Sequence, residues 1–380
     1  MAETATTGGN LKVEDFAARD ILNSIADGVY ITDRDRNIVF WNRTAEQITG
    51  WGPSAVVGRS CRDNLLVHVD KDGHQLCGKE HCPLHRAMVT GARSVAPVLV
   101  FAQHKDGQRV PVEVSVAPLF NAAGEVIGGI ELFRDMTNAV GDLWRAKMIQ
   151  AHTMESSLPF DPRMKFDVSY VPQEMVGGDF YHIERLGQDQ YGLMVADFMG
   201  HGVSAALYCM QLRSLWEDWR DELTRPGRFM AQINTRLNHL AQQDGYFATG
   251  TYVLVDLAAD KVTCVRAGHP APVLLRSNGE VVRLGKQAPA LGLFETVEYP
   301  EQTEHLGQRD SLVLFTDGAV EIANRAHQEL GEEGIVALLR SAQQDNGGLE
   351  LPALEEKLLA YSNELRLADD LTLLVARRMG

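Results

Sequence analysis

Four short motifs, each containing an aspartate, constrain this chain more than any other feature of its sequence. They are centred on Asp179, Asp197, Asp317 and the pair Asp369–Asp370. Apolar runs that predict strands end just before Asp197 and Asp317, and another begins directly after Asp370. A single aspartate beside glycine is more often a turn or cap residue, but four in one region predict a cluster of carboxylates. Because oxygen ligands suit hard cations such as Mg²⁺ or Mn²⁺, we expect a metal-dependent enzyme.

Net charge, apolar runs and cysteine content indicate which partners and which cellular compartment suit this chain. The formal net charge of −15 argues against nucleic acid or an anionic membrane as the main partner. No apolar run approaches the roughly 20 residues that span a bilayer, and the N-terminus shows no secretory signal. Five cysteines, with Cys61, Cys77 and Cys82 crowded together, fit a reducing compartment better than a disulfide framework. We therefore expect a cytoplasmic protein.

The N-terminal third predicts a small α+β domain. Residues 1–14 are polar and rich in Gly and Thr, which indicates a disordered lead-in. Residues 15–138 then hold five strand-like runs, with a helix closed by Gly50. The strands are expected at 28–32, 37–41, 95–103, 109–119 and 126–134, and the helix at 43–49.

Several motifs in this domain occur in a familiar order. They are Gly28-Val29-Tyr30-Ile31-Thr32-Asp33, Phe40-Trp41-Asn42, Ile48-Thr49-Gly50 and Asp135-Met136-Thr137. The stretch from Ile21 to Thr137 resembles a PAS sensory domain. That resemblance implies a five-stranded antiparallel sheet with helices, and a role in sensing or dimerisation without chemistry of its own.

Residues 139–158 predict a linker helix ended by Pro159. Apolar side chains such as Val140, Trp144, Met148 and Ala151 recur at steps of four and three, with Leu143 beside them. This spacing fits a coiled-coil seam, and hence a homodimer through the PAS domain and linker. The alternative is an amphipathic helix packed on one domain.

Residues 159–380 predict a second, larger domain without regular alternation of strands and helices. A mixed sheet sandwich flanked by helices fits this pattern best. Strands are expected at 191–196, 251–257, 261–267, 272–276, 281–284, 312–315 and 371–375, and helices at 203–223, 228–243, 332–342 and 351–365.

The order of motifs in this region carries a second resemblance. The motifs are Gly177-Gly178-Asp179-Phe180-Tyr181, Gly200-His201-Gly202, Ala267-Gly268-His269-Pro270-Ala271-Pro272, Thr316-Asp317-Gly318 and Asp369-Asp370-Leu371-Thr372. Residues 150–378 resemble the PPM-type (type 2C-like) serine/threonine phosphatases, in the bacterial branch of stage II sporulation protein E and the stress-response partner-switching phosphatases. The resemblance implies an αββα sandwich that holds two Mn²⁺ or Mg²⁺ ions.

The resemblance also implies roles for individual residues. Asp197 would bridge both metals, and the backbone carbonyl of Phe198 would complete one coordination shell. Asp317 and Asp369 would hold the second metal, with Asp370 as the alternative if the register differs by one. Asp179 would orient water or bind a metal.

The implied reaction is hydrolysis of phosphoserine or phosphothreonine by a hydroxide shared between two metals. The implied substrate is a phosphorylated regulatory protein, such as an anti-sigma-factor antagonist. Two histidines depart from the family pattern. His201 lies four residues after Asp197, and we interpret it as a turn residue rather than a general acid; His182 replaces an acidic residue.

The cysteine cluster of the first domain supports several interpretations. Cys61, Cys77 and Cys82 with a histidine such as His85 (His68, His74 and His81 are also near) would give four ligands for zinc or iron. A redox sensor and inert thiols are the alternatives. The sequence around Cys61 also resembles a light-sensing flavin motif, but the residues after Arg62 depart from it.

Two other functional classes compete with a phosphatase. One is a catalytically silent interaction module that uses the fold to bind a partner; the intact aspartate motifs disfavour it. The other takes Gly177–Phe180 as a nucleotide-cyclase signature, which the missing glutamate disfavours.

Overall fold

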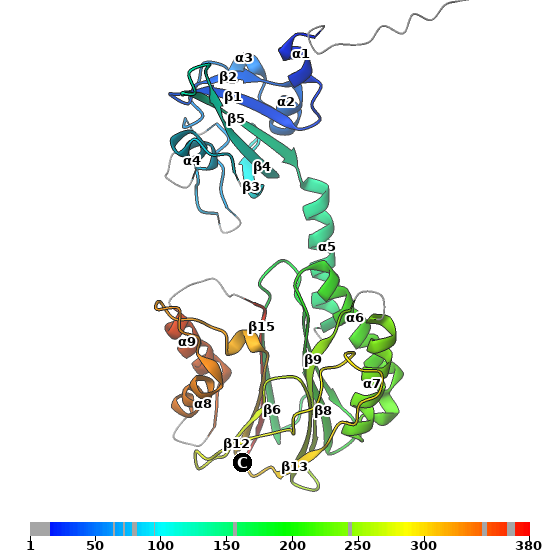
Figure 1. Cartoon of the computed structure of the whole chain (residues 1–380). Helices are drawn as coiled ribbons and strands as arrows, with labels where there is room; N and C mark the ends of the chain where they lie inside the picture. Colours follow the sequence, from blue (N-terminus) through cyan, green and yellow to red (C-terminus); the bar gives the residue numbers. More distant parts are fainter. Residues whose placement is uncertain are drawn as a thin grey trace, which may run out of the picture. The chain divides into compact units, whose positions relative to one another are not determined.

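The computed structural model describes residues 16–63, 65–70, 73–77, 82–94, 96–154, 158–241, 245–343, 348–362 and 369–380. The chain forms two compact units, Met1–Asp142 and Leu143–Gly380 (Figure 1). The lead-in predicted for residues 1–14 lies outside the described residues. No helix in the described part of the chain is long and apolar enough to cross a membrane.

The first unit is built on one antiparallel sheet with the strand order β2-β1-β5-β4-β3. This confirms the predicted α+β class and the five-stranded sheet. Its strands are β1 (Gly28–Asp33), β2 (Ile38–Trp41), β3 (Val98–Gln103), β4 (Arg109–Phe120) and β5 (Val126–Asp135). Its helices are α1 (Ala18–Asn23), α2 (Arg43–Thr49), α3 (Pro53–Val56) and α4 (Pro83–Thr90).

Local capping fixes α2 at its predicted position. The Asn42 side chain accepts a hydrogen bond from the Ala45 amide, and Gly50 ends the helix with φ of 72°. A left-handed residue at this position favours glycine. Asn42 Oδ1 also accepts the Val29 amide, which ties the helix to β1.

Helix α5 (Thr137–Met154) begins directly after β5 and continues into the second unit. Val140 and Met154 are buried, whereas Trp144 and Met148 are 53% and 65% exposed. The helix predicted for 139–158 is present from Thr137 to Met154, whereas Leu158 is not helical; residues 155–157 lie outside the described part.

The second unit is a sandwich of two five-stranded sheets, with α6 and α7 on one outer face and α8 and α9 on the other (Figure 1). This arrangement confirms the predicted αββα architecture. One sheet has the order β13-β10-β9-β8-β7 and the other β12-β11-β14-β15-β6. The strands are β6 (Met164–Val171), β7 (Asp179–Arg185), β8 (Gln190–Phe198), β9 (Ala248–Asp256), β10 (Lys261–Ala267), β11 (Val273–Leu275), β12 (Val281–Arg283), β13 (Gln302–His305), β14 (Ser311–Phe315) and β15 (Leu371–Arg378). The helices are α6 (Val203–Asp218), α7 (Pro226–Ala241), α8 (Gly331–Ala342) and α9 (Leu351–Ser362), with short 3₁₀ turns η2 (Arg220–Glu222) and η3 (Asp317–Ala319).

Both sheets are buried on both faces, which explains their nearly continuous apolar runs. Along β8, Leu193 packs between the sheets while Met194 packs beneath α6 and α7. Along β15, Leu374 packs between the sheets while Leu373 packs beneath α8 and α9. This alternation follows from the two-residue period of a strand. The rigid sandwich fixes the strand ends that carry the aspartates.

Candidate active site

Asp179 and Asp197 face each other at the same end of one sheet. Asp179 is the first residue of β7, and the strand register pairs it with Asp197 near the end of β8. Side chains directly opposite in an antiparallel pair have Cβ atoms about 5 Å apart. Two carboxylates are therefore held side by side by backbone pairing alone.

Hydroxyl groups of the other sheet fix the Asp179 carboxylate. Its Oδ2 accepts hydrogen bonds from Thr316 Oγ1 at 2.8 Å and from Thr372 Oγ1 at 2.6 Å. Thr316 follows β14 and precedes Asp317, and Thr372 lies in β15 just after the Asp369–Asp370 pair. These contacts bring three of the four aspartate motifs to one edge of the sandwich.

The Asp370 carboxylate accepts hydrogen bonds from two backbone amides. The residue is 2% exposed, its Oδ1 accepts the Gln173 amide at 2.6 Å, and its Oδ2 accepts the Gly178 amide at 2.5 Å. Asp369 is only partly buried. The two neighbours therefore have carboxylates in different environments.

Glycines allow backbone segments to approach each other around the carboxylates. A Cβ at Gly318 would lie 2.0 Å from the Asp370 carbonyl oxygen. A Cβ at Gly178 would lie 3.1 Å from the Phe198 carbonyl oxygen, the backbone group that the family resemblance implies as a metal ligand. Gly200 and Gly202 have φ of 87° and 78°, so the turn after Asp197 requires glycine at both positions.

Burial and mutual repulsion disfavour the charged forms of these carboxyls. Burial, with the charges of Asp179 and Asp317 next, raises the pKa of Asp197 to about 9. Burial raises the pKa of Asp179 to about 8, although its threonine hydrogen bonds oppose the shift. Burial and the charge of Asp369 raise the pKa of Asp317.

This donor set fits divalent cations. A positive ion among carboxylates with raised pKa values would stabilise their charged forms and relieve their repulsion. Carboxylate oxygens are also the ligands that Mg²⁺ and Mn²⁺ prefer. As the side chains stand, no group of three or more His, Cys, Asp or Glu within the described residues is close enough to hold a metal ion. The fit therefore rests on the chemistry of the donors and on their repulsion.

The three histidines near the motifs are in different environments. His201 is exposed and its Nδ1 lies 2.9 Å from Glu174 Oε1. His182 is buried against the Trp216 ring, and burial lowers its pKa to about 4. His269 Nδ1 lies 2.8 Å from Thr249 Oγ1, and Thr249 is the β9 residue opposite Asp197.

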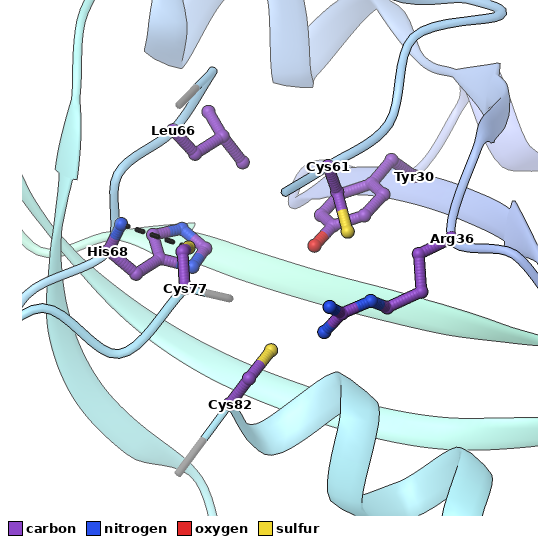
Figure 2. A pocket seen from close by; sticks show the side chains of 7 residues that line it. All are labelled: Tyr30, Arg36, Cys61, Leu66, His68, Cys77 and Cys82. Carbon is purple, nitrogen blue, oxygen red and sulfur yellow. Dashed lines mark hydrogen bonds between the residues drawn. The ribbon is translucent and has the colours of Figure 1, made fainter. Parts of the chain in front are cut away.

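The cysteine cluster of the first unit forms a separate pocket (Figure 2). Cys61, Cys77 and Cys82 line it together with Tyr30, Arg36, Leu66 and His68. The Cys77 sulfur accepts the His68 amide at 3.2 Å. His68, one of the nearby histidines in the sequence, is thus a lining residue, whereas His85 lies in the first turn of α4.

Polar groups in and beside this pocket are buried without hydrogen-bond partners among the described residues. They are Arg36 Nη1, His68 Nε2 and Glu131 Oε1. Burial raises the pKa of Glu131 to about 8 and lowers that of His68 to about 4. Sequence reasoning missed Arg36 and Glu131, because an isolated arginine and a strand glutamate carry no motif.

Comparison with known families assigns both units. The sequence profile of stage II sporulation protein E (SpoIIE) matches residues 187–379, and the profile of the PAS fold matches residues 22–141.

Individual relatives agree with these profiles. The chain is 27% identical over 187 residues to the phosphoserine phosphatase RsbP of Bacillus subtilis, a match that covers 48% of this chain and 46% of RsbP. It is 25% identical over 255 residues to the phosphoserine phosphatase RsbU of the same organism, covering 61% and 69%. The chain thus spans about half the length of RsbP.

Among solved structures, the SiaA-PP2C domain of Pseudomonas aeruginosa superposes with a TM-score of 0.55 at 22% identity. This match covers 64% of the chain and 98% of that domain, and it supports the fold.

Proposed function

The chain belongs to the stage II sporulation protein E family, with a PAS fold ahead of the family domain, and we propose that it is a PAS-regulated, metal-dependent protein serine/threonine phosphatase. The observation that carries the proposal is the Asp179 carboxylate, paired in register with Asp197 and hydrogen-bonded by Thr316 and Thr372. A silent interaction module would not need buried, mutually repelling carboxyls at one edge of the sandwich.

We assign the metal ligands from the environment of each donor. Asp197 would lie between two ions, with the Phe198 carbonyl beside one of them and Asp317 and Asp369 at the other. Asp369 is preferred to Asp370, since both Asp370 oxygens already accept backbone amides. Asp179 would bind a metal or orient water.

In this scheme the ions, when bound, would lower the pKa of water at the site and neutralise the phosphate oxygens. The chain's own residues position the carboxylates. Thr316 and Thr372 orient the Asp179 carboxylate, and Asp370 fixes the loop that leads into Asp179. Because water would attack phosphorus directly and the serine or threonine oxygen would leave with a proton, no covalent phosphoenzyme is required. His201 is exposed beside Glu174, which suits a turn residue.

The proposed substrate is phosphoserine or phosphothreonine on a regulatory protein, such as an anti-sigma-factor antagonist. The names of the relatives RsbP and RsbU as phosphoserine phosphatases support this class. A cytoplasmic location is also proposed, because all five cysteines are free thiols.

We propose a homodimer through the PAS unit and α5. Trp144 and Met148 lie four residues apart and leave an exposed apolar stripe on α5. In a coiled coil, such a stripe would be covered by the same helix of a second copy.

The cysteine pocket is the proposed sensor site. Cys61, Cys77 and Cys82 with His68, rather than His85, offer the soft and imidazole ligands that zinc or iron accepts, and these described side chains would have to move closer together to hold an ion. Metal analysis of the full-length protein purified without oxygen tests this assignment. Less than stoichiometric zinc and iron would leave the thiols as a redox site or as inert groups.

The direct test of the function is metal-dependent hydrolysis of a phosphoserine peptide by the full-length protein. We expect no hydrolysis after treatment with EDTA and recovery on addition of Mn²⁺. Binding of the peptide without hydrolysis in saturating Mn²⁺ would instead support the interaction module.

A further inference from the structure

Gln150 is a buried polar residue of α5 that the proposed reaction does not use. Its side chain is 4% exposed. The Nε2 group donates to the Gly177 carbonyl oxygen at 2.8 Å, and Oε1 accepts the Gly177 amide at 3.2 Å. One side-chain amide thus pairs with both backbone polar groups of a single glycine, which fixes the two peptide planes beside it.

Gly177 and Gly178 lead directly into Asp179, and their other backbone groups are also held. The Gly178 amide donates to Asp370 Oδ2, and the Gly178 carbonyl accepts the Phe198 amide and the Cys209 thiol, both at 3.0 Å. Gln150 is the contribution of α5 to this set of contacts. Removing one buried partner leaves the opposite group unsatisfied, so each contact constrains the loop.

The loop also has no room for a larger residue. A Cβ at Gly177 would lie 2.4 Å from the Tyr170 hydroxyl and 2.5 Å from Asp370 Oδ2. Any shift of the Gly177 backbone would therefore move the groups that hold Asp370 and the first residue of β7. A small displacement at Gln150 reaches Asp179 through two peptide units.

Helix α5 starts at Thr137, two residues after β5 ends at Asp135. Gln150 lies thirteen residues further along the same helix, which is about 20 Å at 1.5 Å per residue. Because backbone hydrogen bonds make a helix stiff over this length, rotation or translation of α5 changes the position of Gln150 directly.

We propose that Gln150 is a positioning residue through which α5 sets the conformation of the Gly177–Gly178 loop and hence the place of the Asp179 carboxylate. The proposal rests on the proposed phosphatase function for its effect on rate. Its effect on the loop is independent of that function.

The test compares full-length wild type with Gln150→Met, which keeps the side-chain volume and removes both hydrogen-bonding groups. His152→Ala changes an exposed residue of the same helix and is the matched control. Hydrogen exchange read by mass spectrometry reports the peptide that contains the Gly177 and Gly178 amides. We expect about tenfold faster exchange in Gln150→Met, because an opening about 1.4 kcal/mol easier corresponds to that factor, and no change in the control.

Hydrolysis of a phosphoserine peptide in saturating Mn²⁺ supplies the second readout. We expect kcat of Gln150→Met to fall about tenfold with KM changed less than twofold, since Gln150 does not touch substrate. Gln150→Glu keeps an oxygen that can accept the Gly177 amide but loses the group that donates to the Gly177 carbonyl. If the Met variant does not fold, this variant is compared with wild type in both measurements.

The outcomes separate the two proposals. If wild type hydrolyses nothing, the phosphatase assignment fails while the exchange comparison still decides the role of Gln150. Equal exchange in wild type and both Gln150 variants, or equal acceleration in His152→Ala, would overturn the inference.

Discussion

Asp369 and Asp370 are adjacent in the chain, yet their carboxylates meet different surroundings. Both oxygens of Asp370 accept backbone amides from the segment that leads to Asp179. Burial is the main cause of the raised pKa values of Asp197 and Asp317; the charge of Asp369 adds to both shifts, and the charge of Asp370 adds to that of Asp197. At the level of single residues, Asp370 stabilises the loop before Asp179, which supports the proposal that Asp369 rather than Asp370 binds a metal.

Alanine substitutions should separate these two roles. Asp370→Ala leaves two buried amides without acceptors, so we expect the free energy of unfolding to fall by about 2–4 kcal/mol. Asp369→Ala should cost less than about 1 kcal/mol and abolish binding of Mn²⁺ at one site. Urea unfolding and calorimetric titration measure the two effects. Unchanged Mn²⁺ binding in Asp369→Ala, with loss in Asp370→Asn, would reverse the assignment.

The raised carboxyl pKa values predict how stability depends on pH. A carboxyl whose pKa rises on folding contributes stability below about pH 4, and this contribution is lost as pH rises through the folded-state pKa. For Asp179 and Asp197 that loss extends to about pH 8 and about pH 9. Melting temperature in EDTA should therefore fall between pH 7 and 8.5, and Mg²⁺ should stabilise more at the higher pH because it then displaces fewer protons. Equal stabilisation by Mg²⁺ at both values would count against a metal among these carboxyls.

At the level of elements, the turn after β14 carries Asp317 and continues into η3. This turn packs closely against the backbone of Asp370, just before β15, and only glycine at position 318 leaves room for that contact. A Cβ there would lie 2.0 Å from the Asp370 carbonyl oxygen, so the turn must move in Gly318→Ala. We expect Mn²⁺ affinity to fall about tenfold, equivalent to about 1.4 kcal/mol. Gly187→Ala, where a Cβ meets nothing within 4 Å, is the matched control for calorimetric titration. Equal affinities in both variants would show that the turn does not set the site.

Element boundaries that depend on local chemistry could be predicted from the sequence. The helix predicted at 43–49 is α2, because its start at Asn42 and its end at Gly50 are both local signals. The helix predicted for 203–223 instead ends at Asp218 and is followed by η2. The strands expected from the sequence do not include β6, although Met164, Phe166 and Val168 alternate with polar residues at the two-residue period of a strand.

Contacts between distant residues could not be predicted in this way. The bonds of Asp179 to Thr316 and Thr372 join residues that are 137 and 193 positions apart. The sequence indicated that strand ends carry carboxylates, but only the packing of the two sheets shows which hydroxyls orient them. The same holds for Gln150, whose partner becomes visible only once α5 lies on the Gly177 loop.

At the scale of the whole molecule, the exposed stripe on α5 predicts assembly. Replacing Trp144 and Met148 with Glu would place charges in a coiled-coil interface, so we expect the dimer to dissociate at least tenfold more readily. Sedimentation velocity of the full-length protein measures this. Leu359→Glu, at an exposed position of α9, is the control. A monomeric wild type, or a dimer unaffected by the double substitution, would contradict the proposed interface.

We propose that the carboxylates around Asp197 hold two metal ions and that this site hydrolyses phosphoserine. The most direct measurement is the Mn²⁺-dependent rate of phosphate release from a phosphoserine peptide by full-length wild type and by Asp197→Ala. We expect the wild type to release phosphate at a rate that EDTA abolishes. The rate of the variant should be lower by at least about 1000-fold, which corresponds to about 4 kcal/mol of transition-state stabilisation. An Asp197→Ala protein that is folded and releases phosphate as fast as wild type would contradict it.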